Sequence, residues 1–308
     1  MNVRLAAPQA LAVESPPRRR RRVRAQPAVA FLLPSALILG VFIIFPIVQS
    51  LWMSFHAWRI GAQSQPWVGL DNYKRLLADP QFANALRVTL VFTAVSVTAL
   101  LVLGFLVAYW LQRTTRLSKI LRSVYFFPTV VALSVIGIVW RFMLDPDIGL
   151  VAGLWRAVGL DPVAWLRTPS LALPAVVAVG IWKNLGFTMI LLLAGLQGVP
   201  EHLYEAARLD GAGPVQQVRY VTLPSIRPAL LFSAVILTIQ SLQAFDLIYA
   251  MTAGGPLFST ETLVTFMYRQ SFQNFDFGYG SAVAWALFIV IMIISALQLR
   301  LFRYNDVD

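Results

Sequence analysis

Residues 199–224 read VPEHLYEAARLDGAGPVQQVRYVTLP and lie between two long apolar segments. Pro200 suits the first turn of a helix, because a backbone N–H would have no partner there, and Glu201 complements the positive end of the helix dipole. Gly211 can adopt a left-handed conformation and end that helix, and Pro214 is placed to begin another. The pattern predicts a helix, a glycine elbow and a second short helix at a membrane surface.

This segment has the character of a docking element. The small side chains of Ala206 and Ala207 let another protein's backbone approach closely, and the elbow sets the angle between the two helices. Its carboxylates can pair with cations of a partner, and they are Glu201, Glu205 and Asp210. The alternative is an ordinary amphipathic loop beside the membrane, and spacing alone does not decide between the two.

The composition indicates an integral membrane protein. The chain has 308 residues, of which 58% are hydrophobic and only 13% charged, and its mean hydropathy is +0.70. A soluble domain of this size needs more charge to cover its surface. Cysteine is absent, which excludes disulfides and thiolate metal sites, and the two histidines lie far apart, so we expect no metal site.

The net charge of +11 does not indicate nucleic-acid binding. Much of it lies in one run, Arg18 to Arg24, directly before a long apolar stretch. Basic residues beside a membrane span are expected from the positive-inside rule and from attraction to anionic lipid. We therefore expect contact with membrane lipid and none with nucleic acid.

Six stretches are long and apolar enough to cross a bilayer, which takes about 20 residues. Backbone in lipid must satisfy its own hydrogen bonds, so these stretches are predicted helices of an all-α membrane protein. A basic tail, 1–26, is predicted to be disordered, and the membrane domain covers 27–308 with a cytoplasmic segment at 199–227. The predicted spans are 28–55, 87–112, 122–144, 172–198, 228–252 and 279–302.

Two further expectations concern these spans. The first is predicted to be a retained signal anchor, because its apolar run is too long for a cleaved signal peptide. Prolines are expected mainly near span ends, where a missing N–H does least harm, and they are Pro34, Pro46, Pro128 and Pro174.

The charge of the short loops predicts the orientation. The N-terminal tail, the loop after the second span and the C-terminal end are all basic, so both termini are predicted to be cytoplasmic. The loops at 56–86, 145–171 and 253–278 then face outward. The basic residues that carry this prediction beyond the tail are Arg113, Arg116, Lys119, Arg122, Arg300 and Arg303.

The docking segment resembles the EAA motif of binding-protein-dependent ABC importer permeases. The motif consists of Glu205-Ala206-Ala207, three residues, Gly211, nine residues, then Val221, any residue, Leu223 and Pro224. Val221 stands where isoleucine is commoner. The stretches 69–73, 182–197 and 245–256 are similar to the carbohydrate-uptake branch, in particular to the first permease of sugar and glycerol-3-phosphate systems. The resemblance runs from about residue 28 to the end.

The resemblance implies a six-helix permease of the type I importer kind in the bacterial inner membrane. It implies a second homologous permease, two cytosolic ATPase subunits and an external solute-binding protein as partners. The helix from Glu205 to Gly211, with Glu201 beside it, would sit in a groove of the ATPase. The chain has no Gly-x-x-x-x-Gly-Lys-Ser/Thr loop, so we expect no enzymatic activity and no bound cofactor here, with ATP and Mg on the partner.

Polar residues inside spans are candidates for the solute pathway. Gln240, Gln243 and Asp246 are spaced so that each lies about 60° from the next on one continuous helix, and amides and a carboxylate suit the hydroxyls of a sugar. Lys183 and Asn184 fall near the middle of the fourth span. The alternatives are hydrogen bonds between helices, an ion pair of Lys183 with Asp246, and attraction of an anionic solute.

The outer end of the fifth span carries a predicted contact for the solute-binding protein. Thr252, Gly254, Gly255 and Pro256 form an irregular turn, and in related importers this region forms a scoop-like contact. A simple turn is the alternative.

The sequence leaves three other functions open. The same machinery could import glycerol-3-phosphate or glycerophosphodiesters. An ion-coupled secondary transporter would work without an ATPase, and it leaves the spaced motif unexplained. A membrane anchor without a pathway is disfavoured by the polar residues within the spans.

Overall fold

The computed structural model describes residues 25–303, with side chains for 32–301. Most of the predicted disordered tail, residues 1–24, lies outside this part. Within it the chain is helical and has no β-strand, only two isolated bridges. The elements are α1 Ala25–Leu39, the π-helical η1 Gly40–Ile44, α2 Phe45–Ser54, α3 Asp71–Ala78, α4 Pro80–Leu111, α5 Arg116–Val130, α6 Leu133–Met143, α7 Leu150–Ala157, α8 Pro169–Gln197, α9 Glu201–Leu209, α10 Pro214–Gln217, the π-helical η2 Val218–Thr222, α11 Leu223–Ser225, α12 Arg227–Leu242, α13 Asp246–Thr252, α14 Leu263–Tyr268, the π-helical η3 Arg269–Gln273 and α15 Phe277–Arg303.

Four helices of the described chain are long and apolar enough to cross a membrane. The number rises to six if each of two bent helix pairs counts as one span, which is the number the sequence predicts. The four are Leu32–Ser54, Pro80–Leu111, Pro169–Gln197 and Phe277–Leu301. The predicted class, an all-α membrane protein, is confirmed.

The predicted third span, 122–144, is two helices and not one. α5 and α6 meet at an angle of 96°. Val131 and Ala132 between them are extended. Pro128 lies in the last turn of α5, where the ring removes a backbone donor, and its carbonyl accepts the N–H of Val131 at 3.3 Å. Pro128 thus lies beside a sharp bend in the middle of the predicted span, whereas the sequence predicts it near a span end.

The predicted fifth span, 228–252, is interrupted as well. α12 ends at Leu242 and α13 begins at Asp246. The carbonyl of Ala244, which has left the helical pattern, accepts a hydrogen bond from Thr262 Oγ1 at 3.1 Å. A break inside a membrane is tolerated where such a group finds another partner in the protein.

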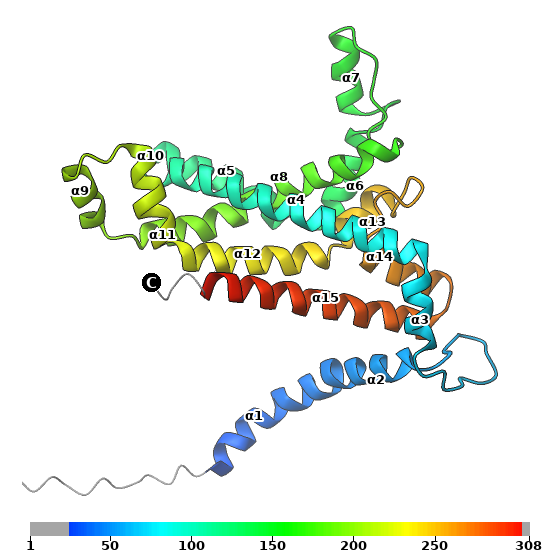
Figure 1. The fold of residues 1–308 in the computed structure, drawn as a ribbon. Helices are drawn as coiled ribbons and strands as arrows, with labels where there is room; N and C mark the ends of the chain where they lie inside the picture. The colour runs from blue at the N-terminus through cyan, green and yellow to red at the C-terminus, as the bar shows by residue number, and fades with distance from the viewer. Residues whose placement is uncertain (1–24, 304–308) are drawn as a thin grey trace, which may run out of the picture. The chain divides into compact units, whose positions relative to one another are not determined.

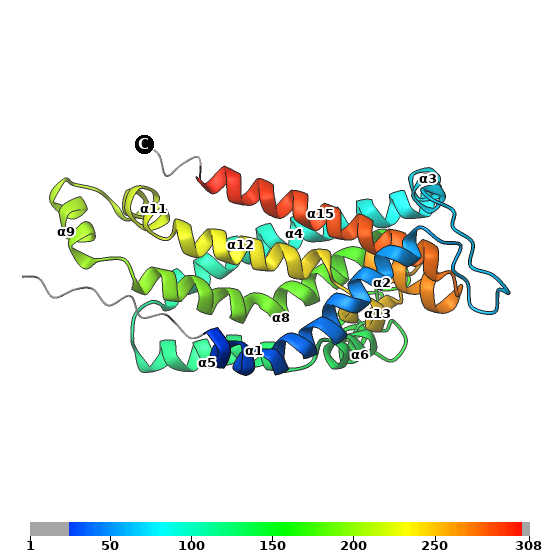
Figure 2. The ribbon, with the colours of Figure 1, turned by 90° about the horizontal axis from the view of Figure 1, so that it is seen from below.

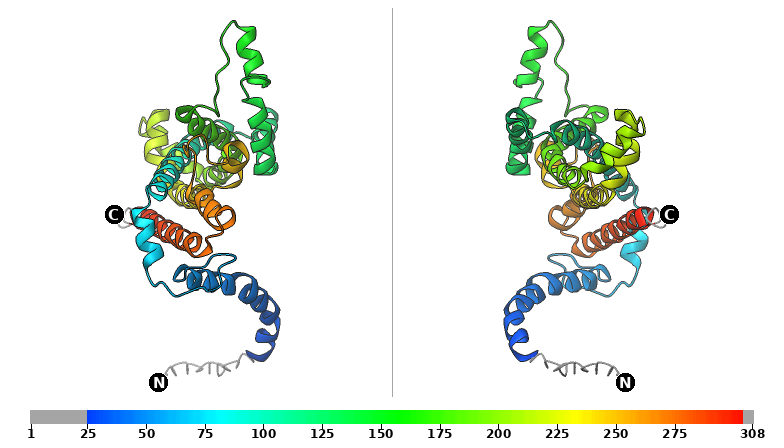
Figure 3. Two further views of the ribbon diagram at one scale, coloured as in Figure 1. Left: turned by 90° about the vertical axis from the view of Figure 1, so that its right-hand side faces the viewer. Right: turned by 90° about the vertical axis from the view of Figure 1, so that its left-hand side faces the viewer.

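The helices α4, α8, α12 and α15 lie side by side as an elongated bundle (Figures 1 and 2). The docking segment α9–α11, the turn from α4 to α5 and the end of α15 lie at one end of it. The helices α3, α6, α13 and α14 lie at the other, and α7 stands away from the bundle there (Figure 3). The loops of residues 50–303 therefore divide between the two ends as the charge pattern predicts.

A close approach of α5 and α8 positions the centre of the bundle. Gly186 of α8 is buried, and a Cβ there would collide with the carbonyl of Tyr125 and with the backbone of Phe126. Only a residue without a side chain allows the two backbones to lie this close. The contact holds the C-terminal half of α5 against the middle of α8.

We expect Gly186→Ala to cost about 1–3 kcal/mol through overpacking, because backbone and not a flexible side chain must move. Thermal unfolding in detergent, followed by circular dichroism, should show a midpoint several degrees lower. Gly153→Ala on α7 is the matched control, since nothing lies within 4 Å of its added Cβ. Equal midpoints for the two variants would contradict the close packing of α5 against α8.

Candidate functional site

A cavity of about 480 Å³ lies between α4, α5, α8 and the α12–α13 interruption. Its walls are apolar for the most part, with Phe92, Phe187 and Phe245 among them. Its polar residues come from five helices, α4, α5, α8, α12 and α13, and from the break. They are Ser96, Thr129, Lys183, Asn184, Gln240, Ser241, Gln243 and Asp246.

The structure brings together all five residues that the sequence selects for the solute pathway. Lys183 and Asn184 project from α8, Gln240 from α12, Gln243 caps the end of α12, and Asp246 opens α13. The predicted spacing of 60° does not apply to Asp246, because it belongs to a separate helix. The interruption nevertheless leaves its side chain on the same cavity.

Lys183 is the buried charge of this cavity. Its relative exposure is 9%, and the ion pairs among the described residues include none that joins it to a carboxylate. The ion pair between Lys183 and Asp246, which was one alternative from the sequence, is therefore not formed. A cation without a carboxylate partner in an apolar wall is costly unless a water-filled space or a ligand solvates it.

The other polar groups of the cavity differ in their exposure and in the hydrogen bonds that they already make within the protein. Asn184 donates its Nδ2 to the carbonyl of Gly180 at 3.0 Å, which leaves its side-chain oxygen as an acceptor. Gln240, Gln243 and Asp246 are exposed at the edge of the cavity. The site thus has one buried cation in the wall and amides and a carboxylate at the rim, which suits a ligand with several hydroxyl groups.

Sequence reasoning missed three hydroxyl groups on this cavity, those of Ser96, Thr129 and Ser241. Ser96 Oγ is buried and has no hydrogen-bond partner within the described part of the chain. Thr129 Oγ1 donates to the backbone carbonyl of Lys183 at 3.2 Å and so joins α5 to α8. Small hydroxyl residues are common along α4, and nothing in the sequence distinguishes Ser96 from its neighbours.

The docking segment has the predicted local structure. α9 is followed by Gly211 at φ +78°, a left-handed conformation. The N–H of Gly211 bonds to the carbonyl of Arg208 at 3.1 Å, and that of Ala212 to Ala207 at 2.9 Å, so the last helical carbonyls are satisfied. Pro214 begins α10 as predicted.

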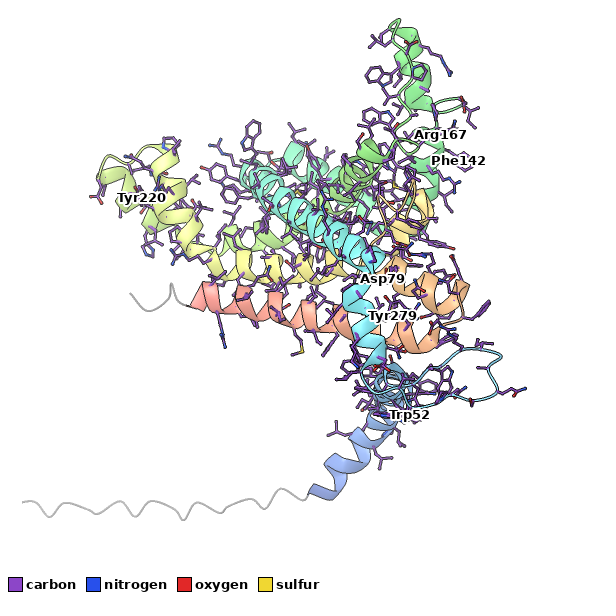
Figure 4. All side chains as sticks on the ribbon, turned by 45° about the vertical axis from the view of Figure 1, so that its right-hand side comes forward. Trp52, Asp79, Phe142, Arg167, Tyr220 and Tyr279 are labelled. Carbon is purple, nitrogen blue, oxygen red and sulfur yellow. The ribbon has the colours of Figure 1, made fainter. Side chains whose placement is uncertain are left out.

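This segment offers its side chains to a partner. α9 buries none of its residues, and Glu201, Glu205 and Asp210 are exposed. A hydrogen bond of 3.0 Å between Tyr204 Oη and Thr222 Oγ1 ties α9 to η2. Three apolar side chains near the elbow are mostly exposed, namely Leu209 at 90%, Val215 at 80% and Tyr220 at 68% (Figure 4). Charge and apolar surface together are typical of a docking surface.

The turn after α13 differs in part from its prediction as a contact surface. Thr252 Oγ1 lies 2.7 Å from Thr260 Oγ1, and Thr260 donates to the carbonyl of Gly255 at 2.8 Å. Gly254 is buried at φ +88° against Glu261, so it is not available for contact. The exposed tip is Leu257, at 85% exposure and φ +50°, which sequence reasoning missed.

A second cavity, of about 420 Å³, lies beside this turn. Thr252, Gly255 and Pro256 line it together with Arg141 and Arg167. Arg167 bridges the carboxylates of the 145–147 loop at 3.0 and 2.9 Å. The backbone N–H groups of that loop and the guanidinium lower the pKa of the first of these carboxyls, Asp145. Figure 4 shows Arg167 at this end, far from Tyr220.

A helical bundle with a polar cavity at a helix break and an exposed docking segment at one end defines a membrane transport subunit. The chain matches the family described as binding-protein-dependent transport system inner membrane component over residues 81–306. The chain belongs to this family of ABC transporter permeases. Membership explains the docking motif, which the alternatives of an ion-coupled transporter and a simple anchor leave unexplained.

Known members resemble the chain over nearly its whole length. The trehalose/maltose transport system permease protein MalF of Thermococcus litoralis is 34% identical, with 89% of this chain and 92% of that protein covered. The sulfoquinovosyl glycerol transport system permease protein SmoG of Agrobacterium fabrum is 31% identical, covering 91% of each. A chain of a bacterial ABC transporter involved in the import of the acidic polysaccharide alginate superimposes with a TM-score of 0.81 at 25% identity, covering 91% of this chain and 96% of that one.

We expect Gly211→Val to reduce solute uptake by the complete transporter about tenfold. A β-branched side chain disfavours the left-handed elbow by on the order of 1–2 kcal/mol, and no neighbour of Gly211 would relieve or add to that cost. Gly211→Asn is the control, because asparagine adopts the left-handed conformation more readily. Both variants should assemble in the membrane, and equal loss of uptake in both would contradict the role of the elbow's conformation.

Proposed function

We propose that this chain and a second, homologous permease form the pathway for uptake of a sugar or a sugar-like solute through a bacterial inner membrane. Two cytosolic ATPase subunits drive the import, and a solute-binding protein outside delivers the solute. The chain itself binds no nucleotide, and ATP with Mg belongs to the ATPase. The docking segment and both termini face the cytoplasm.

The observation that supports this function is the polar lining of the cavity at the α12–α13 break. Gln243, Asp246 and the free oxygen of Asn184 supply donors and acceptors on one space. A small number of placed polar groups in an apolar cavity is typical of a site for a hydroxylated small molecule. The relative that transports trehalose and maltose supports the same class of solute.

The docking segment supports the ATP-driven mechanism. Its exposed carboxylates and its elbow lie at the bundle end opposite the turn after α13. Closure of the ATPase pair would move α9, and α10–α11 would pass this movement on to α12, which carries Gln240 and is followed directly by Gln243. The two permeases would then alternate between openings to the inside and to the outside.

An anionic solute is the second candidate, and Lys183 favours it. A buried cation without a carboxylate partner among the described residues could neutralise a phosphate, a sulfonate or a uronate. The relative for sulfoquinovosyl glycerol and the transporter of acidic alginate agree with such a solute. Glycerol-3-phosphate and glycerophosphodiesters remain in this class.

The experiment that tests the proposal is ATP-dependent uptake in vesicles that hold the two permeases, the ATPase and the binding protein. Labelled maltose, trehalose and glycerol-3-phosphate are offered in parallel. Uptake of a sugar that stops when ATP is omitted supports the proposed function. Uptake that follows an ion gradient without ATP would overturn it.

Lys183→Met separates the two classes of solute within the same vesicles. We expect sugar uptake to stay within about twofold of the wild type, because hydroxyls do not need the charge. For an anionic solute we expect a loss of at least tenfold, as one lost charge-assisted hydrogen bond is worth about 1.5–3 kcal/mol. Lys74→Met is the control, since Lys74 in α3 is an exposed cation that pairs with Asp71 and does not line the cavity. A tenfold loss of sugar uptake would contradict a pathway for neutral solutes.

The tip of the turn after α13 provides a test of the binding-protein contact. We expect Leu257→Asp to lower the stimulation of ATP hydrolysis by the binding protein about tenfold, because the exposed side chain would dock in an apolar site. Basal hydrolysis should not change, since Leu257 is far from the docking segment. Leu154→Asp on α7, also mostly exposed at 62%, is the control. Full stimulation in the Leu257 variant would exclude this tip from the contact.

A further inference from the structure

Five aromatic side chains form a continuous row that begins at the cavity. We call Phe245, Tyr249, Tyr268, Phe272 and Phe277 the aromatic row. Its consecutive ring centroids lie 5.1, 5.3, 5.2 and 5.6 Å apart. Phe245 also approaches Tyr268 directly, at 5.2 Å.

The row joins the cavity to the bundle end opposite the docking segment. Phe245 stands in the break between α12 and α13 and lines the cavity. Tyr249 follows one turn later in α13, Tyr268 ends α14, and Phe272 lies in η3. Phe277 begins α15 at that end of the bundle (Figure 1).

None of the five rings of this row is fully buried, and Phe245, Tyr268 and Phe277 are half-buried. Tyr249 is 37% exposed and Phe272 55% exposed. The adjacent pair Phe266 and Tyr279 shows what packing aromatics look like in this region, since both are 0% exposed with centroids 6.1 Å apart. α14 therefore buries Phe266 against Tyr279 of α15, and it carries Tyr268 of the row, which is only half-buried.

Polar groups accompany the row at both of its ends. Gln243 and Asp246 are exposed where it meets the cavity, and Gln273 and Asn274 are exposed beside Phe272. A purely lipid-facing strip would not be expected to carry amides at both ends and a carboxylate at one of them. The combination of flat apolar rings and flanking hydrogen-bonding groups matches a molecule with apolar faces and polar edges.

We propose that the aromatic row is a lane along which the pyranose rings of a carbohydrate pass from the outer mouth to the cavity. The axial C–H groups of a pyranose form an apolar face that stacks on an aromatic ring, while its equatorial hydroxyls point to the sides. Stacking is weak and tolerant of direction, so a sugar can move from ring to ring. This inference rests on the proposed function and specifies the outer half of its pathway.

The first test uses the absence of cysteine from the chain. Tyr268→Cys and Phe272→Cys are placed singly in the complete transporter, and a charged, membrane-impermeant thiol reagent is added outside. Phe288→Cys in the middle of α15 is the control, with a native exposure of 49% that matches Phe272. We expect the row positions to react at least tenfold faster than the control, and a mixture of maltose and trehalose, but not mannitol, to slow them at least threefold.

Two results of this test would overturn the lane. Reaction of both row positions as slow as at Phe288 would mean that lipid or the apolar surface of the partner permease covers the row. Fast reaction that the sugars do not slow would mean an aqueous surface without carbohydrate. The first result does not depend on which solute the transporter imports, and the second applies when the vesicles take up maltose or trehalose.

The second test measures uptake of the transported sugar. Tyr249→Leu and Tyr268→Leu should raise KM at least fivefold, whereas Tyr249→Phe and Tyr268→Phe, which keep the ring, should stay within twofold of the wild type. Phe288→Leu is the control for loss of an exposed ring. Wild-type KM in both leucine variants overturns the lane while sugar import stands. No sugar uptake by the wild type contradicts the proposed function instead, and the thiol reaction then decides the lane alone.

Discussion

Backbone hydrogen bonding in a medium without water is the constraint on which this structure depends. Helices satisfy it along α4, α8 and α15, and a break is tolerated only where the protein replaces the missing partners. At the α12–α13 interruption Thr262 donates to the carbonyl of Ala244, and at the start of α14, directly after Thr262, Thr89 Oγ1 accepts the N–H of Leu263 at 2.8 Å. The hydroxyls of two threonines thus bond to backbone groups that have no partner within a helix.

The cavity is a direct consequence of this arrangement. A continuous helix would carry Gln240, Gln243 and Asp246 as one stripe against its neighbours. The interruption instead turns Phe245 and Asp246 toward the space beside Lys183. The close contact of α5 with α8 at Gly186 holds the opposite wall, so that a polar space exists between helices that are otherwise closely packed.

Local rules predict a large part of this structure from the sequence. The elbow at Gly211 follows from glycine and proline chemistry, and the selection of Lys183 follows from the cost of a charge in lipid. The break at residues 243–245 could not be predicted, because it contains neither glycine nor proline and depends on Thr262, which is distant in sequence. Burial of Gly254 and exposure of Leu257 likewise follow from contacts within the turn, with Glu261 and Thr260, that the sequence pattern does not reveal.

The rim of the cavity, where Gln240, Gln243 and Asp246 are exposed, has a consequence for how such a protein changes over generations. A binding site enclosed by one chain can alter its selectivity only through that chain. With the proposed second permease as the remaining wall of an open site, selectivity becomes a joint property of two genes. A substitution at the rim can then be tolerated, or exploited, through a change in the other gene, and this gives the pair more routes to a new solute than either chain has alone.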